Sequence, residues 1–293
     1  MVTRNDDAAS SEESTMTIHE TATIDSSARI DPSVEIGPYC VIGPNVELGA
    51  GCRLHDHVSI QRDTTIGEGN SFHPYCVIGG DPQDRKYDGE QTMCQIGDGN
   101  EIREHVTIHR GTANGGSVTA IGDGNLLMVG CHVAHDCRIG NEVVIANQVM
   151  LAGHVYIEDG ASIGGGAGIH HFATIGSCSF VGGLARISRD VPPYMIVEGH
   201  PAEVRALNVI ALARRGYEPG HIEALKESFK RLFRGNGSVS EHTRSLRVEF
   251  ADVPAVLRLC DSMDASSDGT HGRALESRRK DDKWSGKVEA ESR

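Results

Sequence analysis

The sequence predicts a mainly β protein, a parallel β-helix of hexapeptide repeats followed by a small α-helical C-terminal domain. Three observations support this prediction. An apolar residue recurs at every sixth position over most of residues 18–187, glycine often follows it, and the spacing becomes helical after the repeat ends. Neither the 3.6-residue period of a helix nor the two-residue period of a strand gives a strict period of six. Stacked hexapeptide repeats do.

In each hexad we expect the apolar side chain to point into a triangular prism, with three hexads forming one coil. Glycine and asparagine supply the corner conformations that branched residues resist. The apolar positions are Ile18, Ile24, Ile30, Ile36, Ile42, Leu48, Leu54, Ile60, Ile66, Phe72, Ile78, Ile96, Ile102, Ile108, Ile121, Leu127, Val133, Ile139, Ile145, Leu151, Ile157, Ile163, Ile169, Ile175, Val181 and Ile187.

Two segments interrupt the repeat. Residues 79–95 lack the pattern, but Ile78 and Ile96 are 18 positions apart, so we expect this segment to span one full coil as an extruded loop. Residues 109–120 shift the phase by one residue. Loops that leave a rigid scaffold often carry binding residues.

The C-terminal part changes character after a segment rich in proline and glycine. Residues 218–235 have apolar side chains at helical spacing, with Pro219 near the start and Gly235 at the end. We therefore predict four parts, which are a disordered acidic extension (1–15), a β-helix domain (16–205), a helical domain (206–263) and a disordered tail (264–293).

Composition excludes several classes of function. Lys and Arg number 28 against 41 Asp and Glu, a net charge of −13, which argues against nucleic-acid binding. No apolar run approaches the roughly 18 residues of a membrane span, so we expect no membrane insertion. The acidic N-terminus resembles neither a signal nor a transit peptide, which predicts a cytoplasmic location with reduced cysteines.

The stretch CHVAHDC (131–137) combines two cysteines, two histidines and an aspartate. Its cysteines lie two positions before an inward residue, where any small side chain would serve. We interpret these cysteines, and four others at the same hexad position, as buried filler rather than metal ligands or a redox pair. The six are Cys40, Cys52, Cys76, Cys94, Cys131 and Cys137.

The histidines around this stretch are predicted to gather on one edge of the prism. Residues 18 apart should stack about 4.8 Å from one another on successive coils. His135, Gly153 and His171 form such a column. His154 and His170 lie one step from it, and His132 lies on the same edge, so a functional site is expected there.

The cluster is compatible with three interpretations. Zinc needs ligands at tetrahedral spacing, and γ-class carbonic anhydrases do place histidines on a left-handed β-helix. Acyl transfer needs a base, a group that orients it and a donor for the oxyanion. A structural solenoid needs none of these. Asp136 beside His135, with Gly153 one coil above, favours acyl transfer without a metal.

Several motifs resemble the UDP-N-acetylglucosamine O-acyltransferase family, in order and with consistent spacing from about residue 17 to 217. They are IGGDPQDRKYDGE (78–90), IREHVTIHRGT (102–112), NLLMVGCHVAHDC (125–137), LAGHV (151–155), DVPPY (190–194) and ALARRGY (211–217). The resemblance implies a homotrimer of left-handed parallel β-helices with active sites in clefts between subunits. It also implies transfer of an (R)-3-hydroxyacyl chain from acyl carrier protein to the 3-hydroxyl of UDP-GlcNAc, the first committed step of lipid A biosynthesis, without a cofactor.

The resemblance assigns roles to individual residues. His135 would be the general base, Asp136 its orienting partner and the Gly153 amide the oxyanion donor. The other residues would bind substrates. His132, His154 and His170 would line the pocket for the sugar and the acyl chain, and Gln83, Asp84 and Lys86 would hold the sugar and the pantetheine phosphate, with His109 beside the second interruption. Asn208 and Arg214 would face the nucleotide, His171 stands where the family often has a glutamine that contacts the nucleotide, and Gly183 would lie at the end of the acyl chain.

Other activities remain open at this point. A related N-acyltransferase carries an additional N-terminal uridine-binding domain, for which the repeat leaves no room, but a 3-amino sugar nucleotide is not excluded as acceptor. The basic stretch 226–234 is either a solvated helix face or a docking surface for acyl carrier protein.

Overall fold

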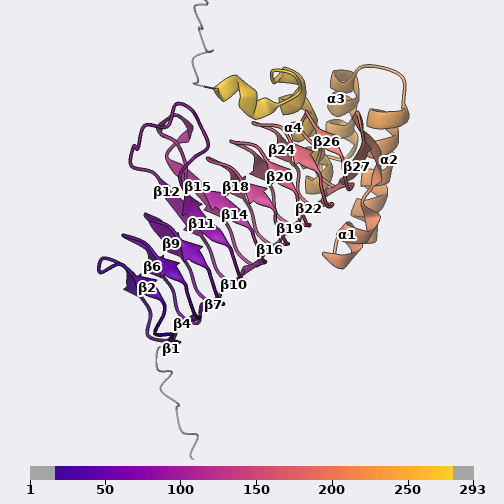
Figure 1. Cartoon of the computed structure of the whole chain (residues 1–293). Coiled ribbons are helices and arrows are strands. Elements are labelled where there is room, and N and C mark those ends of the chain that lie inside the picture. Colours follow the sequence, from indigo (N-terminus) through magenta and orange to yellow (C-terminus); the bar gives the residue numbers. More distant parts are fainter. Residues whose placement is uncertain (1–16, 280–293) are drawn as a thin grey trace, which may run out of the picture.

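The computed structural model describes residues 17–279, which form a long triangular prism of stacked coils with helices gathered at its C-terminal end (Figure 1). Each coil contributes one short strand to each of three parallel sheets. The predicted fold, a left-handed parallel β-helix with a small helical C-terminal part, is confirmed. The expected acidic extension, residues 1–15, lies outside the described residues.

Three sheets form the faces of the prism, and we call them sheets A, B and C. Sheet A contains β1 (Thr17–Ile18), β4 (Glu35–Ile36), β7 (Arg53–Leu54), β10 (Ser71–Phe72), β13 (Glu101–Ile102), β16 (Leu126–Leu127), β19 (Val144–Ile145), β22 (Ser162–Ile163), β25 (Phe180–Val181), β27 (Met195–Gly199) and β28 (Ala202–Leu207). Sheet B contains β2 (Thr23–Ile24), β5 (Val41–Ile42), β8 (Ser59–Ile60), β11 (Val77–Gly80), β14 (Thr107–His109), β17 (His132–Val133), β20 (Met150–Leu151), β23 (Gly168–Ile169) and β26 (Arg186–Ile187). Sheet C contains β3 (Arg29–Ile30), β6 (Glu47–Leu48), β9 (Thr64–Ile66), β12 (Met93–Ile96), β15 (Val118–Ile121), β18 (Arg138–Ile139), β21 (Tyr156–Ile157) and β24 (Thr174–Ile175).

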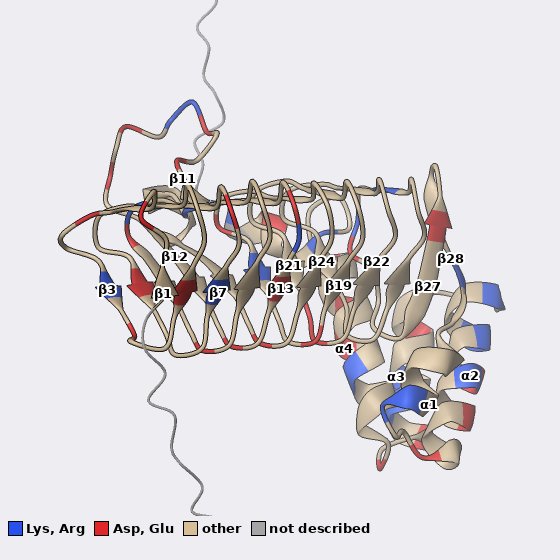
Figure 2. Cartoon of the chain, turned by 60° about the horizontal axis from the view of Figure 1, so that its bottom comes forward, with Lys and Arg blue, Asp and Glu red and all other residues tan. Residues whose placement is uncertain are grey.

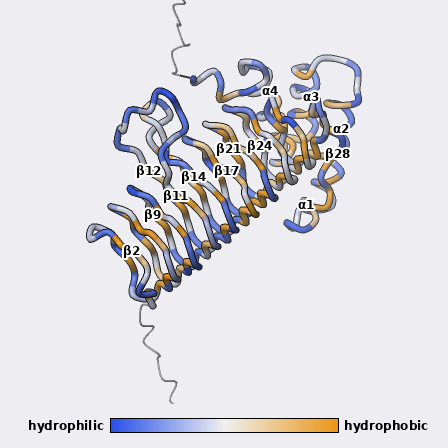
Figure 3. Tube along the Cα trace, in the orientation of Figure 1, coloured by the Kyte–Doolittle hydropathy of each residue, from blue (hydrophilic) through white to orange (hydrophobic). Residues whose placement is uncertain are grey.

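The repeated apolar residues form the core, as the hexad pattern predicts. All of them from Ile36 to Ile187 are buried, and Figure 3 shows hydrophobic stretches recurring on successive coils. The first coil differs, because Ile18 is 41% exposed and both Ile24 and Ile30 are only partly buried. A stack of repeats covers each coil with the next, so its first coil has a neighbour on one side only.

Both interruptions leave the prism at the same corner, between sheets B and C. Ile96 pairs with Ile66 of sheet C, whereas Ile78 pairs with Ile60 and Ile108 of sheet B. The expectation that residues 79–95 span one full coil is therefore wrong. The segment makes a single step from one face to the next and extrudes the extra residues, and residues 109–120 do the same one coil later.

The helical part begins later and ends later than predicted. The boundary at residue 205 falls inside β28, which forms a hairpin with β27. The helices are α1 (Val209–Arg214), α2 (Pro219–Arg234), α3 (Val239–Glu249) and α4 (Pro254–Asp268), with 3-10 turns η1 (Ala113–Gly115) and η2 (Ala274–Arg278). Helix α2 has Pro219 in its first turn and Gly235 at its C-cap, as predicted. No helix within residues 17–279 is long and apolar enough to cross a membrane.

The prediction of a disordered tail from residue 264 is wrong for residues 264–279. Helix α4 continues to Asp268, and the chain then returns to the β-helix and ends in η2. The sequence of this segment shows no hydrophobic pattern, because partly buried polar contacts hold the segment in place. The Arg273 guanidinium donates to the Ser188 carbonyl at 2.6 Å and pairs with Glu276. Residues 280–293 lie outside the described part of the chain.

Candidate active site

The predicted histidine column lies at the corner between sheets B and C, directly above the two extruded segments. We call residues 134–136, 152–154 and 170–172 the histidine edge. Each set follows one strand of sheet B, namely β17, β20 or β23, so the regular register of these strands places the three sets on successive coils. The structure therefore brings His135, Gly153 and His171 together as the 18-residue spacing predicts.

His135 and Asp136 form a hydrogen-bonded pair on this edge. The distance from His135 Nδ1 to Asp136 Oδ2 is 2.8 Å, and the Asp136 side chain is 0% exposed against 15% for His135. A carboxylate accepts, so the proton of a neutral His135 ring resides on Nδ1 and the Nε2 lone pair is available. This arrangement suits a general base that is oriented by a buried carboxylate.

The second extruded segment encloses the Asp136 carboxylate. Thr112 donates to it through its backbone N–H at 2.9 Å and its hydroxyl at 2.7 Å, and the Asp136 N–H donates to the Thr119 hydroxyl at 2.8 Å. A Cβ on Gly115 would lie 1.9 Å from Asp136 Cγ, so the segment approaches too closely for any side chain there. The roles of Thr112, Gly115 and Thr119 were not predicted from the sequence, where their only signal is the broken phase of the repeat around them.

Gly153 approaches the His135 ring so closely that a side chain would displace it. A Cβ at residue 153 would lie 2.6 Å from His135 Cε1 and 2.8 Å from Nε2. Its backbone φ is outside the left-handed region, so space rather than conformation requires glycine here. Within residues 17–279 the Gly153 N–H donates to no acceptor. An unoccupied backbone donor beside a candidate base is what an oxyanion site requires.

Two adjoining hollows meet at His135 and Gly153. One, of about 620 Å³, runs along sheet B, and the other, of about 720 Å³, lies under the first extruded segment. They bring together most of the predicted substrate-binding residues. Gln83, His132 and His170 line the first hollow, and Gln83, Asp84, Lys86, His154 and His171 line the second.

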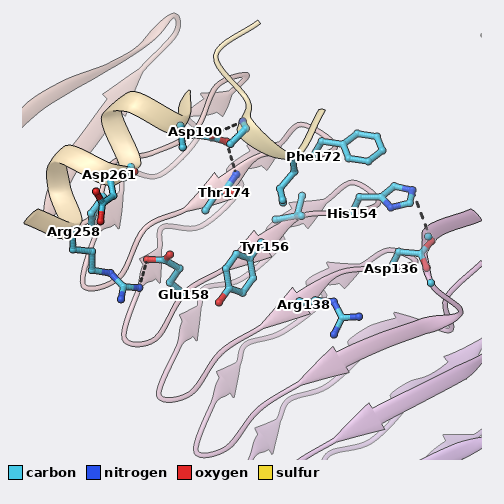
Figure 4. A pocket seen from close by; sticks show the side chains of 18 of the residues that line it. Asp136, Arg138, His154, Tyr156, Glu158, Phe172, Thr174, Asp190, Arg258 and Asp261 are labelled. Carbon is cyan, nitrogen blue, oxygen red and sulfur yellow. Dashed lines mark hydrogen bonds and ion pairs between the residues drawn. The ribbon is translucent and has the colours of Figure 1, made fainter. Parts of the chain in front are cut away.

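A further hollow of about 710 Å³ lies between sheet C and α4, where Figure 4 shows its lining. It reaches Asp136 and His154 but neither His135 nor Gly153. We therefore place the chemistry in the two hollows that adjoin the base.

His132 and His109 form an edge-to-face pair of rings below His135 and Asp136, with ring planes 77° apart. Their rings are 4.7 Å apart, and the Thr107 hydroxyl lies 2.7 Å from His132 Nδ1. Burial, together with the charge of His135, lowers the pKa of His132. His109 lies beneath His132 and lines neither of the two hollows. It therefore packs under His132 and does not line the space open to substrates.

The buried His109 makes the stability of the protein depend on pH. Burial and the charges of neighbouring histidines lower the pKa of His109 to about 4, whereas an unfolded histidine has a pKa near 6.5. The folded state thus favours the neutral ring, and unfolding takes up a proton as the pH falls from 6.5 towards 4. We expect about 2 kcal/mol of stability to be lost through His109 between pH 7 and pH 5.

Urea unfolding at the two pH values checks this expectation, with His109→Gln as the comparison. The variant should show a smaller loss of unfolding free energy than the wild type on going from pH 7 to pH 5. The same loss in both proteins would contradict the assignment of a neutral, buried His109.

Three predicted residues lie away from the histidine edge within one chain. Gly183 follows β25 at the corner between sheets A and B. Asn208 caps α1 by accepting from the Ala211 N–H at 3.2 Å and donates to the Cys178 carbonyl at 3.0 Å, so its amide donor is already used within the chain. Arg214 lies exposed in the last turn of α1. A single chain therefore does not assemble the complete predicted site.

The cysteine prediction agrees with the described structure. All eight cysteines are buried and unpaired, and burial raises the pKa of the Cys137 thiol to about 12. Such thiols are poor nucleophiles and poor metal ligands, because both roles need the thiolate.

Two groups of side chains in residues 17–279 have potential metal ligands close together. These are His135, Asp136 and His154, and His170, His171 and Glu276. In the first, the carboxylate already accepts from His135 and Thr112, and in the second it pairs with Arg273 and Arg279. Two arginines neutralise Glu276 in the second group, and in the first the His135–Asp136 pair has the geometry of a base oriented by a carboxylate, so we assign a zinc site to neither group.

Comparison with known proteins identifies the family. The chain is 42% identical over 230 residues to the acyl-[acyl-carrier-protein]--UDP-N-acetylglucosamine O-acyltransferase of Rhizobium rhizogenes, covering 76% of this chain and 83% of that protein. The Myxococcus xanthus protein of the same name is 45% identical over 206 residues, covering 70% of this chain and 80% of that protein. The chain belongs to the UDP-N-acetylglucosamine O-acyltransferase family.

A similar solved structure and two sequence-family models agree with this assignment. The structure of LpxA from Acinetobacter baumannii matches with a TM-score of 0.81 at 42% identity, covering 83% of this chain and 95% of that one. The model described as "Udp N-acetylglucosamine O-acyltransferase; Domain 2" matches residues 190–271, and the model for bacterial transferase hexapeptide repeats matches residues 15–50 and 119–153. The chain is thus an acyltransferase, and the hollows at His135 are its candidate active site.

Proposed function

We propose that this chain transfers an (R)-3-hydroxyacyl group from acyl carrier protein to the 3-hydroxyl of UDP-GlcNAc, the first step of lipid A biosynthesis, in the cytoplasm and without a metal or cofactor. The observation that supports this best is the combination at His135 of a buried carboxylate on Nδ1 and a glycine packed against Nε2, whose backbone N–H has no acceptor within residues 17–279. The names of the relatives point to the same donor and acceptor.

The reaction follows from this geometry. His135 Nε2 takes the proton of the sugar hydroxyl as its oxygen attacks the thioester carbonyl, and Asp136 stabilises the imidazolium that forms. The Gly153 N–H donates to the oxyanion of the tetrahedral intermediate. When the carbon–sulfur bond breaks, the imidazolium returns the proton to the departing pantetheine thiolate. The products are the acylated sugar and the free thiol of the carrier protein.

The complete site needs a second copy of the chain in a homotrimer. Gly183, Asn208 and Arg214 lie away from His135 in their own chain, so a neighbouring subunit would supply them for the end of the acyl chain and the nucleotide. The exposed apolar side chains of sheet B and its corner with sheet A support a subunit interface there. They include Tyr39 (58% exposed), Met150 (58%) and Leu184 (82%). Large apolar side chains on one face are typical of oligomer contacts.

A panel of substrates tests the proposed function. Purified protein is incubated with UDP-GlcNAc, or with its 3-amino analogue, and with hydroxyacyl carrier proteins of several chain lengths. The product is then identified by mass spectrometry and by its lability to alkali. We expect an alkali-labile ester from UDP-GlcNAc. An alkali-stable amide, formed only from the amino sugar, would support the related N-acyl activity instead.

The basic stretch of α2 is the candidate docking surface for acyl carrier protein, and the blue parts of the α2 ribbon in Figure 2 mark its Lys and Arg positions. Its cations are partly neutralised, because Lys226 pairs with Glu223 at 2.7 Å and Arg231 with Glu249 at 2.6 Å. The electrostatic attraction is therefore smaller than the sequence alone suggests.

Charge reversal measures this attraction. Replacing Lys226, Lys230 and Arg231 by glutamate should raise the KM for the acyl carrier protein by roughly two- to fivefold at low salt, with a smaller effect at high salt. The KM for UDP-GlcNAc serves as the internal control and should stay the same. An unchanged KM for the carrier protein at low salt would remove α2 as a docking surface.

A further inference from the structure

The C-terminal segment 269–279 crosses from α4 back to the β-helix and reaches the candidate active site. In Figure 1 this yellow segment and the extruded loop after β11 rise from the same edge of the prism. The family model ends at residue 271, so most of the segment lies beyond the part of the chain that the model describes.

Partly buried polar contacts anchor the segment to the β-helix. Asp190 accepts from the Thr174 N–H at 2.7 Å with one carboxylate oxygen and from the Ala274 N–H at 2.8 Å with the other (Figure 4). The Asp190 N–H donates to the Gly272 carbonyl at 2.8 Å. Together with the contact between Arg273 and the Ser188 carbonyl, these bonds fix the path of the segment on both sides of Arg273.

The end of the segment places a cation against the histidine edge. Arg279 pairs with Glu276 at 3.1 Å, and its guanidinium carbon lies 5.5 Å from the centre of the Phe172 ring. Phe172 in turn stacks on His154, with ring centres 4.3 Å apart and ring planes 7° apart. A guanidinium held over an aromatic face and tied to a carboxylate has a defined position, because both contacts restrict its rotamers.

Arg279 lines the same hollow as His135 and Gly153. Arg85 and Lys86 of the first extruded segment also line it, with Asp84 as the one carboxylate among its lining residues. Three cations and one carboxylate line this hollow, and Glu276, outside the lining, offsets part of the Arg279 charge, so an excess of cations remains for a phosphate group. A guanidinium suits phosphate because its planar donor fork matches two oxygens.

We propose that segment 269–279 forms one wall of the hollow that His135, Gly153 and Arg279 line, and that Arg279 binds a substrate phosphate there. This inference rests on the proposed function, which offers two sources of phosphate. One is the diphosphate of the nucleotide sugar and the other is the phosphodiester of the pantetheine arm of the carrier protein. Glu276 is a positioning residue that holds Arg279 against Phe172.

Steady-state kinetics with each substrate varied in turn tests the proposal and separates the two sources. Arg279→Gln should raise the KM for the substrate whose phosphate binds there by roughly three- to tenfold, and the KM for the other substrate and kcat should stay within about twofold. Arg279→Lys, which keeps the charge but not the fork, should recover part of the loss. Arg29→Gln removes an equivalent charge from β3, in the first coil of the prism, and should leave both constants unchanged.

Two truncations provide the second measurement. Chains 1–279 and 1–271 differ only by residues 272–279, and thermal unfolding checks that both remain folded. We expect the shorter chain alone to show the raised KM. The proposal is overturned if Arg279→Gln changes neither KM, if it raises both equally, or if chain 1–279 already shows the full effect. An inactive wild-type protein would instead contradict the proposed function itself.

Discussion

Replacing His135 by alanine is expected to lower kcat for acyl transfer by roughly 10²- to 10⁴-fold, the usual contribution of a general base. The sugar hydroxyl is a weak nucleophile, and the His135 ring is oriented by a buried carboxylate on Nδ1 and has Gly153 packed against Nε2. The KM values should change little, because the ring acts mainly on the transition state. Steady-state rates with UDP-GlcNAc and a hydroxyacyl carrier protein measure the effect.

A matched control separates the loss of a base from the general effect of removing a histidine. His242→Ala removes a ring from α3 whose Nε2 lies 3.0 Å from the Asn236 carbonyl, away from the histidine edge. This variant should keep wild-type rates. A His135→Ala protein with more than about one tenth of the wild-type kcat would contradict the role of His135 as the base.

Replacing Gly153 by alanine should lower kcat by about 10²-fold, although it removes no functional group. The new Cβ would lie 2.6 Å from His135 Cε1, so the ring has to move away from its position on Asp136. A displacement of about 1 Å in a catalytic group costs on the order of 10²-fold in rate. The backbone N–H of residue 153 remains, so the loss reports on the position of His135. Steady-state kcat measures this loss.

Gly220→Ala is the control for this substitution. A Cβ at this position, in the first turn of α2, would meet no atom within 4 Å. It should leave kcat unchanged. Wild-type activity in Gly153→Ala would show that the ring and the glycine are not in contact in the working enzyme.

The sequence predicted the histidine edge because the repeat is unbroken there. From residue 121 to 187 a step of 18 residues is one coil, so His135 and Gly153 could be placed on adjacent coils by counting alone. Counting in steps of 18 gave a wrong placement for residues 79–95, because an extruded loop can contain any number of residues without changing the coil. Strand pairing shows that Ile96 belongs to the next face, which puts both loops at the corner of the active site.

The residues that hold Asp136 and the tail segment in place could not be predicted by counting repeats. Thr112 and Thr119 reach Asp136 through the irregular segment 109–120, whose path follows no period. The tail segment 269–279 was missed for a related reason. Its fixed position depends on single polar contacts, such as that of Asp190 with Ala274, which leave no hydrophobic pattern in the sequence.

The central claim is that His135 and Gly153 act as one unit, and a double-mutant cycle tests it most directly. Single-turnover rates are measured for the wild type, His135→Ala, Gly153→Ala and the double variant. Without the imidazole the alanine at position 153 no longer meets it, so the double variant should be no slower than His135→Ala alone. If the two losses multiply in the double variant, the contact between His135 and Gly153 does not organise the catalytic centre.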